Sequence, residues 1–297
     1  MHYNLLHADW KEYELIDSGD GEKLERFGQT VLIRPEPKAL WEPTADAPWA
    51  QAHARYIRSS EGGGHWKYYR QLPKAWILRW NDISFEVRPT GFKHTGVFPE
   101  QSSIWSSIRA ILTSSGRHAN VLNLFAYTGG STLAALSAGA KVTHVDAVKD
   151  MVDWAHKNAE LSNLVSKPVR WIVDDAIKFV KREIKRGVKY DAIIMDPPKF
   201  GRGSHGEIWK IEKDLPNLLQ LCCQLLTPDP LFFLVNAYDV SYTAVSLRNI
   251  VGQQLLHLKG TVDFGELTIK PTRGDMLLST SIYAMYTHYA KASRVAI

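Results

Sequence analysis

The stretch VLNLFAYTGGSTLAALSAGAKVTHVD, residues 121–146, indicates the class of fold. An apolar run from Val121 to Phe125 has the composition of a buried strand, and the glycine pair after it opens a helix predicted over residues 130–138. A second apolar run follows and ends at Asp146. Strand, turn, helix and strand in this order predict a β-α-β unit with two parallel strands.

The same alternation continues to the end of the chain. From about residue 100 we predict five strands separated by helices, and then two strands joined by the turn PTRGD, residues 271–275. This order predicts an α/β fold with a seven-stranded, mostly parallel, Rossmann-like sheet whose last strand is antiparallel. The predicted strands are Val121–Phe125, Lys141–Asp146, Val169–Val173, Tyr190–Asp196, Leu231–Asn236, Thr261–Lys270 and Leu277–Tyr286, and the predicted helices are Gly130–Ala138, Lys149–Ser162, Ala176–Arg186 and Ile208–Leu226.

The first hundred residues have a different pattern of short strands and turns. A strand is predicted from Gln29 to Arg34, and HWKYYRQLPKAWILRW, residues 65–80, resembles two strands around a turn at residues 72–74. Seven of the ten tryptophans lie in the first 105 residues, which indicates a region with a separate role. We therefore predict a small β-rich domain over residues 1–95 and an α/β domain over residues 96–297.

The composition limits the class of protein. A hydrophobic content of 45% and a charged content of 23% over 297 residues are typical of globular proteins. We find no leader peptide and no apolar run of membrane-spanning length. The two cysteines, Cys222 and Cys223, are adjacent, so they provide neither a disulfide framework nor a metal-ligand spacing, and a cytoplasmic location without a metal site is expected. A net charge of +5 mildly favours a polyanionic partner.

Chemically useful residues follow four consecutive predicted strands. Ligands of open parallel sheets bind beyond the carboxyl ends of the strands, where the strand order reverses. Gly129-Gly130 follows the first strand, Asp146 the second, Asp174-Asp175 the third and Asp196 the fourth. Each alone is commonly a tight turn or a helix cap. Together they predict a site for a cofactor that contains a nucleoside, with Asp146 placed to accept both ribose hydroxyls.

The turn itself favours one cofactor over another. A nicotinamide dinucleotide site would prefer Gly-x-Gly-x-x-Gly, but residues 127–131 read Tyr-Thr-Gly-Gly-Ser and have no third glycine. An acid near the turn suits a cationic amino-acid cofactor better than a pyrophosphate. S-adenosylmethionine fits, with Asp146 at the ribose, Asp175 at the adenine amino group and the glycine turn at the methionine end.

The stretch AIIMDPPKFGRGSHG, residues 192–206, ends the fourth strand with an acid and two prolines. Because proline cannot donate to a strand ladder, the chain must leave the sheet there. A carboxylate and rigid carbonyls at this point can hold a planar acceptor that carries an amine, and a nearby aromatic ring can stack on it. The alternative is a strand terminator followed by a surface loop. The predicted catalytic residues are Asp196, Pro197, Pro198 and Phe200.

These motifs resemble a known family. The stretch from residue 121 to residue 164, with DDAIKFV and YDAIIMDPPKF after it, is similar to class I methyltransferases of the 23S ribosomal RNA large-subunit methyltransferase I/K type. HTGVFPEQ, residues 94–101, resembles the segment that precedes the catalytic domain in that family and contributes to its cofactor site. The resemblance covers roughly residues 90–297. It implies a cofactor site for S-adenosylmethionine formed by Gln101, Phe125, Ala126, Tyr127, Thr128, Gly129, Gly130, Asp146, Ala147, Asp175, Ala176 and Asp196.

The chain departs from that family in two respects. It is too short for the RNA-binding PUA domain that many members carry, and the β-rich region takes its place. Members that methylate cytosine C5 use a cysteine after the fifth strand, because C5 is a poor nucleophile. Here the sequence at that place is LVNAYDVSY, residues 234–242. We therefore predict direct transfer to a nitrogen or an oxygen, which needs mainly alignment.

Three further segments are candidates for contact with the substrate. HWKYYR, residues 65–70, interleaves aromatic and basic residues as single-stranded RNA binders do, although a half-buried strand has the same pattern. Residues 201–210 are predicted to form a mobile loop over the acceptor, with His205 either a proton shuttle or a surface residue. A helix over residues 177–189 presents a basic face that contacts RNA or is simply solvated; its cations are Lys178, Lys181, Arg182, Lys185, Arg186 and Lys189.

The sequence thus predicts methyl transfer from S-adenosylmethionine to a base of ribosomal RNA. Three alternatives remain open: a methyltransferase for a protein or a small molecule, a non-catalytic RNA binder that senses the cofactor, and, more distantly, a nicotinamide dehydrogenase. The target nucleotide, the methylated atom and the oligomeric state do not follow from the sequence.

Overall fold

The computed structural model describes residues 3–59, 63–202 and 206–288. Its chain forms two compact units, and neither is continuous in sequence. Unit 1 comprises Met1–Leu6, Ile104–Glu266 and Ser281–Ile297, and unit 2 comprises His7–Ser103 and Leu267–Thr280. A single division near residue 95 therefore does not describe the units, because the segment between the last two strands belongs with the N-terminal region.

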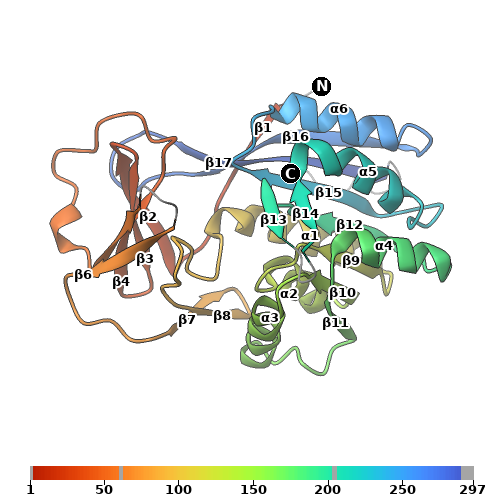
Figure 1. Ribbon diagram of the computed structural model, residues 1–297, viewed down its shortest axis with the longest axis horizontal. Coiled ribbons are helices and arrows are strands. Elements are labelled where there is room, and N and C mark those ends of the chain that lie inside the picture. Colours follow the sequence, from red (N-terminus) through yellow and green to blue (C-terminus); the bar gives the residue numbers. More distant parts are fainter. Residues whose placement is uncertain (1–2, 60–62, 203–205, 289–297) are drawn as a thin grey trace. The chain divides into compact units, whose positions relative to one another are not determined.

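Unit 1 contains a large sheet with the strand order β1-β16-β17-β15-β12-β9-β10-β11 (Figure 1). The central strands pair in parallel, and β17 is antiparallel to β15, which confirms the predicted mostly parallel sheet. The sheet has eight strands rather than seven, because the N-terminal segment joins its edge beside β16. The strands are β1 (Tyr3–His7), β9 (Asn120–Leu124), β10 (Lys141–Asp146), β11 (Val169–Val173), β12 (Ala192–Met195), β15 (Phe232–Tyr238), β16 (Gly260–Ile269) and β17 (Leu278–His288).

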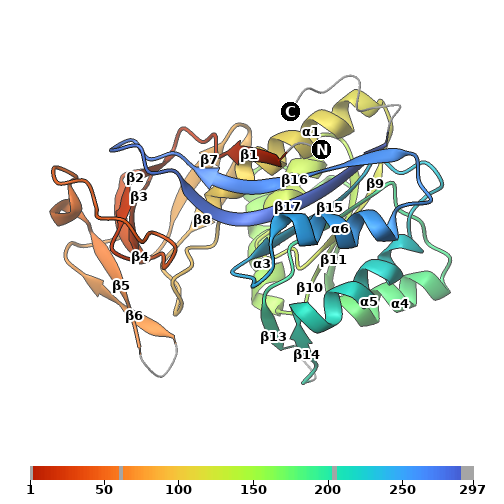
Figure 2. The ribbon, with the colours of Figure 1, turned by 90° about the horizontal axis from the view of Figure 1, so that it is seen from above.

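Helices cover both faces of this sheet. In Figure 2, α4, α5 and α6 lie in a row on one face, and α1 lies on the other. The central strands are mostly apolar, as expected of parallel strands buried on both faces, although β9 and β10 carry the buried Asn123 and His144. Ile193, Phe233 and Val235 are each at most 1% exposed. The four predicted helices are present, and two were not predicted, α1 and α6. The helices are α1 (Ser102–Ser115), α2 (Gly130–Ser137), α3 (Lys149–Leu161), α4 (Ala176–Lys185), α5 (Ile211–Cys223) and α6 (Ala244–Gln254).

Unit 2 is built from β-strands, as predicted for the N-terminal region. A five-stranded sheet has the order β2-β3-β4-β5-β6, and β7 and β8 form a separate antiparallel pair. The two strands predicted around residues 72–74 are present as β6 and β7, but they lie in different sheets. The strands are β2 (Tyr13–Gly19), β3 (Glu22–Phe27), β4 (Thr30–Pro35), β5 (Ala54–Arg58), β6 (Gly64–Tyr68), β7 (Trp76–Trp80) and β8 (Ile83–Val87).

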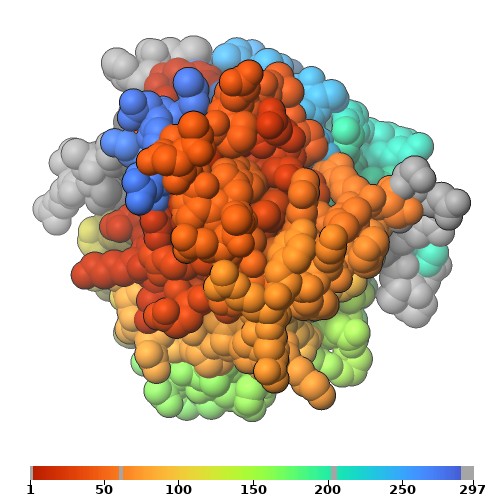
Figure 3. Space-filling model, turned by 90° about the vertical axis from the view of Figure 1, so that its left-hand side faces the viewer, coloured from red at the N-terminus to blue at the C-terminus, as the bar shows by residue number. Residues whose placement is uncertain are grey.

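The segment between β16 and β17 packs on the N-terminal strands of unit 2. The backbone N–H groups of Thr272 and Arg273 donate to the carbonyls of Leu15 and Ile16, both at 2.9 Å. In Figure 3 the blue surface of this segment lies beside the red and orange surface of the N-terminal sequence. These contacts explain why residues so late in the chain belong to unit 2.

Charged groups are buried inside unit 2. Arg34 donates from Nε and Nη2 to the two carboxylate oxygens of Glu25 at 2.6 and 2.7 Å, and the Tyr13 hydroxyl donates to Glu25 at 2.8 Å. Lys23 lies 3.5 Å from Glu25 and 3.6 Å from Glu36. Burial alone would raise the pKa of Glu25, but Arg34 and Lys23 outweigh it and lower the pKa to about 2.

Within the described part of the chain, no helix has the length and apolar character needed to cross a bilayer.

Candidate functional site

The strand register brings the predicted site residues to one edge of the sheet. Leu124 at the end of β9 pairs with Val145 on β10 and with Met195 on β12. Asp146 in turn pairs with Val173 at the end of β11. The acids that follow these strands are therefore neighbours at the carboxyl edge, since adjacent strands lie about 4.8 Å apart. The strand order reverses between β9 and β12, which is where ligands of such sheets bind.

The turn after β9 has an unusual backbone. Phe125 and Tyr127 have φ angles of 54° and 49°, in the left-handed region that non-glycine residues occupy at a cost of about 1–3 kcal/mol each. Hydrogen bonds hold this shape: Ala126 N–H donates to the Val145 carbonyl at 3.1 Å, and Tyr127 N–H donates to Asp146 Oδ2 at 2.8 Å. Strained backbone of this kind clusters at ligand sites, so the turn is a candidate for ligand contact.

The two glycines of the turn also have packing roles. Gly129 has a φ of 92°, and a Cβ atom there would lie 3.0 Å from the Cβ of Ala155 on α3. A Cβ at Gly130 would lie 2.4 Å from the ring of Trp105 on α1. Glycine is needed at both positions for α2 to pack against α1 and α3, whatever binds at the turn. The glycine pair therefore does not identify a ligand by itself.

Asp146 is the acid most closely tied to the turn. Its Oδ2 accepts from Tyr127 N–H, and its Oδ1 accepts from Val148 N–H at 2.9 Å. Burial raises the pKa of this carboxyl, although the backbone hydrogen bonds act in the opposite direction. A carboxylate has about four lone-pair sites, so this group can still accept from a hydroxyl outside the chain. Ala147 is half-buried beside it, and Thr128 is buried, with its carbonyl accepting from Asn158 Nδ2 at 2.9 Å.

The acids after β11 have structural partners of their own. Asp175 is the N-cap of α4, where its Oδ1 accepts from Lys178 N–H at 2.9 Å, and Ala176 begins the helix and is buried. Asp174 forms an ion pair with Arg182, and its N–H donates to the Asp146 carbonyl at 3.0 Å. Helix capping was the simpler alternative for such an aspartate, and Asp175 has that role here. Its position at the same edge as Asp146 is compatible with an additional ligand contact.

The Asp-Pro-Pro segment is held by a tryptophan that sequence reasoning missed. Trp209 Nε1 donates to the Pro198 carbonyl at 2.6 Å, and its ring centroid lies 5.0 Å from that of Phe125. The carbonyl of Pro198 thus has a partner within the chain and is not simply open to an acceptor. Asp196 is half-buried at the end of β12, and its N–H donates to the Leu124 carbonyl at 3.4 Å, while Pro197 is buried. A tryptophan within a stretch of glycine and polar residues was the signal available.

The loop predicted over residues 201–210 is instead partly a two-stranded ribbon. Phe200 begins β13 (Phe200–Arg202), which pairs antiparallel with β14 (Ile208–Lys210). The buried Trp209 ring anchors this ribbon, which explains why glycines did not make the whole segment a loop. The Phe200 side chain is 49% exposed. His205 lies outside the described residues.

Other predicted residues lie elsewhere. Gln101 belongs to unit 2, in the 3-10 helix Pro99–Gln101, and is 7% exposed. The cysteines lie on α5, and burial raises the pKa of Cys222 well above its usual value and that of Cys223 to about 12. Among the described residues, no cluster of His, Cys, Asp and Glu could hold a metal ion.

The basic face of α4 largely serves ion pairs within unit 1. Lys178 pairs with Glu207, Arg182 with Asp174, and Arg186 with Glu183 at 2.9 Å. Lys189 donates to the Gln224 carbonyl at 2.7 Å. Four of the six predicted RNA-contacting cations therefore have partners in the protein, which weakens the case for an RNA-binding helix.

Several known proteins are similar to this chain. The family described as Conserved hypothetical protein 95 matches residues 90–219. The chain is 28% identical over 183 residues to the ribosomal RNA large subunit methyltransferase K/L of Syntrophotalea carbinolica, and 27% identical over 245 residues to that of Pseudoalteromonas atlantica. These matches cover 61% and 76% of the chain but only 25% and 33% of those two enzymes.

A solved structure gives the more extensive match. The SAM-dependent methyltransferase from Agrobacterium tumefaciens is 39% identical, has a TM-score of 0.91, and is matched over 95% of this chain and 92% of its own. Such identity over nearly the full length of both chains is found between members of one family. The chain belongs to the S-adenosylmethionine-dependent methyltransferases.

Proposed function

We propose that this protein transfers a methyl group from S-adenosylmethionine to a base of ribosomal RNA. The observation that carries the proposal is the shared register of β11, β10, β9 and β12, which aligns Asp146, Asp175 and Asp196 at the switch point. The curated relatives that act on ribosomal RNA support the acceptor class. An enzyme with this substrate would work in the cytoplasm, with the ribosomes.

The residues at the edge fit the chemistry of this cofactor. Asp146 offers carboxylate oxygens to the ribose hydroxyls, and the raised pKa that burial gives it reports a desolvated site where hydrogen bonds are stronger. Asp175 would accept from the adenine amino group. The turn at residues 125–130, with the residues that flank Asp146 and Asp175, completes the proposed cofactor site.

The acceptor would lie beyond β12. S-adenosylmethionine supplies an electrophilic methyl group on a sulfonium. Asp196 accepts a hydrogen bond from the acceptor base and orients its nucleophilic atom, while Phe200 stacks on the base. The Pro197-Pro198 backbone keeps Asp196 in place, and Trp209 fixes that backbone through the Pro198 carbonyl. Catalysis on this scheme comes mostly from alignment.

A covalent cysteine intermediate is not part of the proposal. Cys222 is fully buried in the core, and burial raises the pKa of both thiols, which disfavours the thiolate that attack requires. Transfer to a ring nitrogen, an exocyclic nitrogen or an oxygen needs no such nucleophile. We expect the double variant Cys222→Ala, Cys223→Ala to keep its turnover number within a few-fold of wild type.

The test is radiolabelled methyl transfer to RNA from a strain that lacks this gene. We expect nuclease-sensitive label with the wild type, and a loss of at least about 100-fold in kcat with Asp196→Ala, the size found when a positioned polar group is removed from an active site. Asp153→Ala is the matched control, because Asp153 is an exposed acid of the same unit that pairs with Lys149. Label in protein, or none while the cofactor still binds, would contradict an RNA acceptor.

A further inference from the structure

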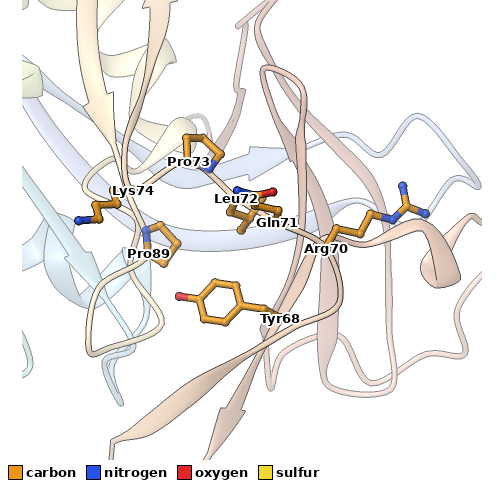
Figure 4. Close-up of a pocket in the computed structure, with 7 residues that line it drawn as sticks. All are labelled: Tyr68, Arg70, Gln71, Leu72, Pro73, Lys74 and Pro89. Carbon is orange, nitrogen blue, oxygen red and sulfur yellow. The ribbon is translucent and has the colours of Figure 1, made fainter.

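Unit 2 has a hollow of about 390 Å³ that the proposed reaction does not use. It is lined by Tyr68 at the end of β6, by residues 70–74, which link β6 to β7, and by Pro89 after β8. Its volume falls in the range of small-molecule sites, roughly 300–1,000 Å³. Figure 4 shows the Tyr68 ring next to Pro89, with Lys74 and Arg70 extending to opposite sides.

Two side chains tie the strand on one side of this hollow to the loop on the other. Trp66, two residues before Tyr68 on β6, donates from Nε1 to the Thr90 carbonyl at 2.8 Å, and its ring packs edge-on against Tyr56 at 5.4 Å. The Tyr56 hydroxyl donates to the Gly91 carbonyl at 3.3 Å. The strand that carries Tyr68 is thus tied to the loop that carries Pro89.

The chemistry of the slot is aromatic and cationic. Tyr68 is 56% exposed, although tyrosine rings usually bury more of their surface. Arg70 and Lys74 line the hollow and no acid does. The whole segment from Gly64 to Trp80 has four Lys and Arg residues and no Asp or Glu. An exposed ring with flanking cations is complementary to a planar base with phosphates on either side.

We propose that this slot binds one unpaired nucleotide of the RNA, with its base stacked on Tyr68 and its flanking phosphates near Arg70 and Lys74. The identity of that RNA as the substrate rests on the proposed function, but binding to the slot does not. A second hollow of about 520 Å³ shares Gln71, Leu72 and Pro73 with the first and is also lined by Arg79. The RNA strand therefore has room to continue beyond the first hollow. The HWKYYR motif would then combine both roles considered for it: Trp66 packs inward and Tyr68 faces the ligand.

The test is fluorescence anisotropy of the full chain with a labelled single-stranded oligoribonucleotide. Tyr68→Ala should weaken binding by about tenfold, and Tyr68→Phe, which keeps the ring, by less than about twofold. The double variant Arg70→Gln, Lys74→Gln should lower the slope of log Kd against log salt by about 1.4, because each single-strand phosphate contact contributes about 0.7.

A control of equal charge change separates contact from net charge. Arg273→Glu lowers the net charge by two, as the double glutamine variant does, at an exposed residue of unit 2 outside the slot. We expect it to leave the salt slope within error of wild type. An equal fall in slope for both variants, or unchanged affinity in Tyr68→Ala, would overturn the proposal.

Two further readouts identify the ligand and separate this proposal from the proposed function. RNA containing 4-thiouridine should crosslink to the peptide with Tyr68, and crosslinks confined to other peptides would overturn the slot. We expect excess DNA-free ribosomal RNA to displace the RNA probe from the wild type, and a proline-rich peptide to leave it bound. If the peptide binds more tightly than the RNA, the slot binds proteins instead. Normal methylation of RNA with wild-type KM in Tyr68→Ala would refute the slot alone, whereas Tyr68-dependent binding without any RNA methylation would refute the function alone.

Discussion

In unit 1 the central strands are mostly apolar and the acids come where these strands end, whereas in unit 2 charged side chains lie within the sheet itself. Ile193 and Val235 typify the first arrangement, and Glu25 and Arg34, at 0% and 4% exposure, typify the second. At the edge of unit 1, Asp146 accepts from the backbone of the turn, Asp175 caps α4 and Asp174 pairs with Arg182. The buried charges of unit 2 form ion pairs and hydrogen bonds with one another, so their role is structural. A ligand of that unit would therefore bind to its surface and not to these charges.

This difference has a thermodynamic basis. A fold with a buried ion pair is not much more stable than the same fold with apolar residues in its place. Removing only one partner of the pair, however, leaves an uncompensated buried charge, which is strongly destabilising. Asp196, at the carboxyl edge of the sheet in unit 1, is only half-buried, so changing it should cost less in folding. Variants of the buried charges in unit 2 should therefore affect mainly stability, and variants of Asp196 mainly activity.

The largest effect is expected at Glu25. Glu25→Gln should lower the free energy of unfolding by about 3–5 kcal/mol, because Arg34 and Lys23 would remain charged beside it. Chemical denaturation measures this. Glu22→Gln is the matched control, since Glu22 is only partly buried and pairs with the exposed Arg55 at 2.7 Å on the same sheet, and it should cost at most about 1 kcal/mol.

The double variant Glu25→Leu, Arg34→Met tests whether the uncompensated charge causes the loss of stability in Glu25→Gln. It removes both charges and keeps similar volume, so it should recover most of the stability lost in Glu25→Gln. If the single variant costs no more than the Glu22 control, the buried network is not what holds unit 2 together and the comparison fails.

A smaller, pH-dependent effect is expected from a buried histidine of unit 1. Burial lowers the pKa of His144 from 6.5 to about 3, and its Nδ1 lies 2.9 Å from Thr132 Oγ1. The unfolded chain binds a proton near pH 6.5 that the folded chain does not, so stability falls as the pH falls below 6.5. Between pH 7 and pH 5 this group should remove about 2 kcal/mol.

His144→Gln should flatten this dependence, as measured by denaturation at a series of pH values. His94→Gln provides the comparison in unit 2, because burial, with Arg34 and Lys93 adding to it, also lowers the pKa of His94 to about 3. Each variant should lose a similar share of the acid sensitivity of the wild type. A full wild-type slope in His144→Gln would show that this histidine is protonated, or exposed, in the fold at pH 5.

The parallel core could be predicted from the sequence because its signal is local. β10 and β11 begin and end at the predicted residues, because each is a short run rich in β-branched and aromatic residues. Helix α1 was missed because its many serines are weak helix formers, although Ile104, Ile108 and Ile111 recur at helical spacing. The five-residue β1 pairs only through tertiary contact and has little pattern of its own.

The site could be predicted less completely, because half of it depends on contacts across the fold. The acids at strand ends follow from the strands. The Trp209–Pro198 hydrogen bond and the Trp105–Gly130 contact join residues that no local pattern links. In unit 2, the motif that contains Tyr68 is visible in the sequence, but Pro89, which completes the slot, lies on another element. The return of residues 267–280 to unit 2 is equally non-local.

The smallest effect concerns the basic face of α4 and decides where the RNA runs. Of its six cations, four already have partners in the protein, and an acid beside a cation cancels much of its field at the distance of a phosphate. Lys181→Gln with Lys185→Gln should therefore weaken RNA binding by less than about twofold and lower the salt slope by well under the 1.4 expected for Arg70 and Lys74. Both double variants remove two charges, so anisotropy titrations at several salt concentrations compare them directly. Equal losses would mean that the RNA follows a basic track over unit 1 as well, and that the division into a catalytic edge and a separate RNA-binding unit is wrong.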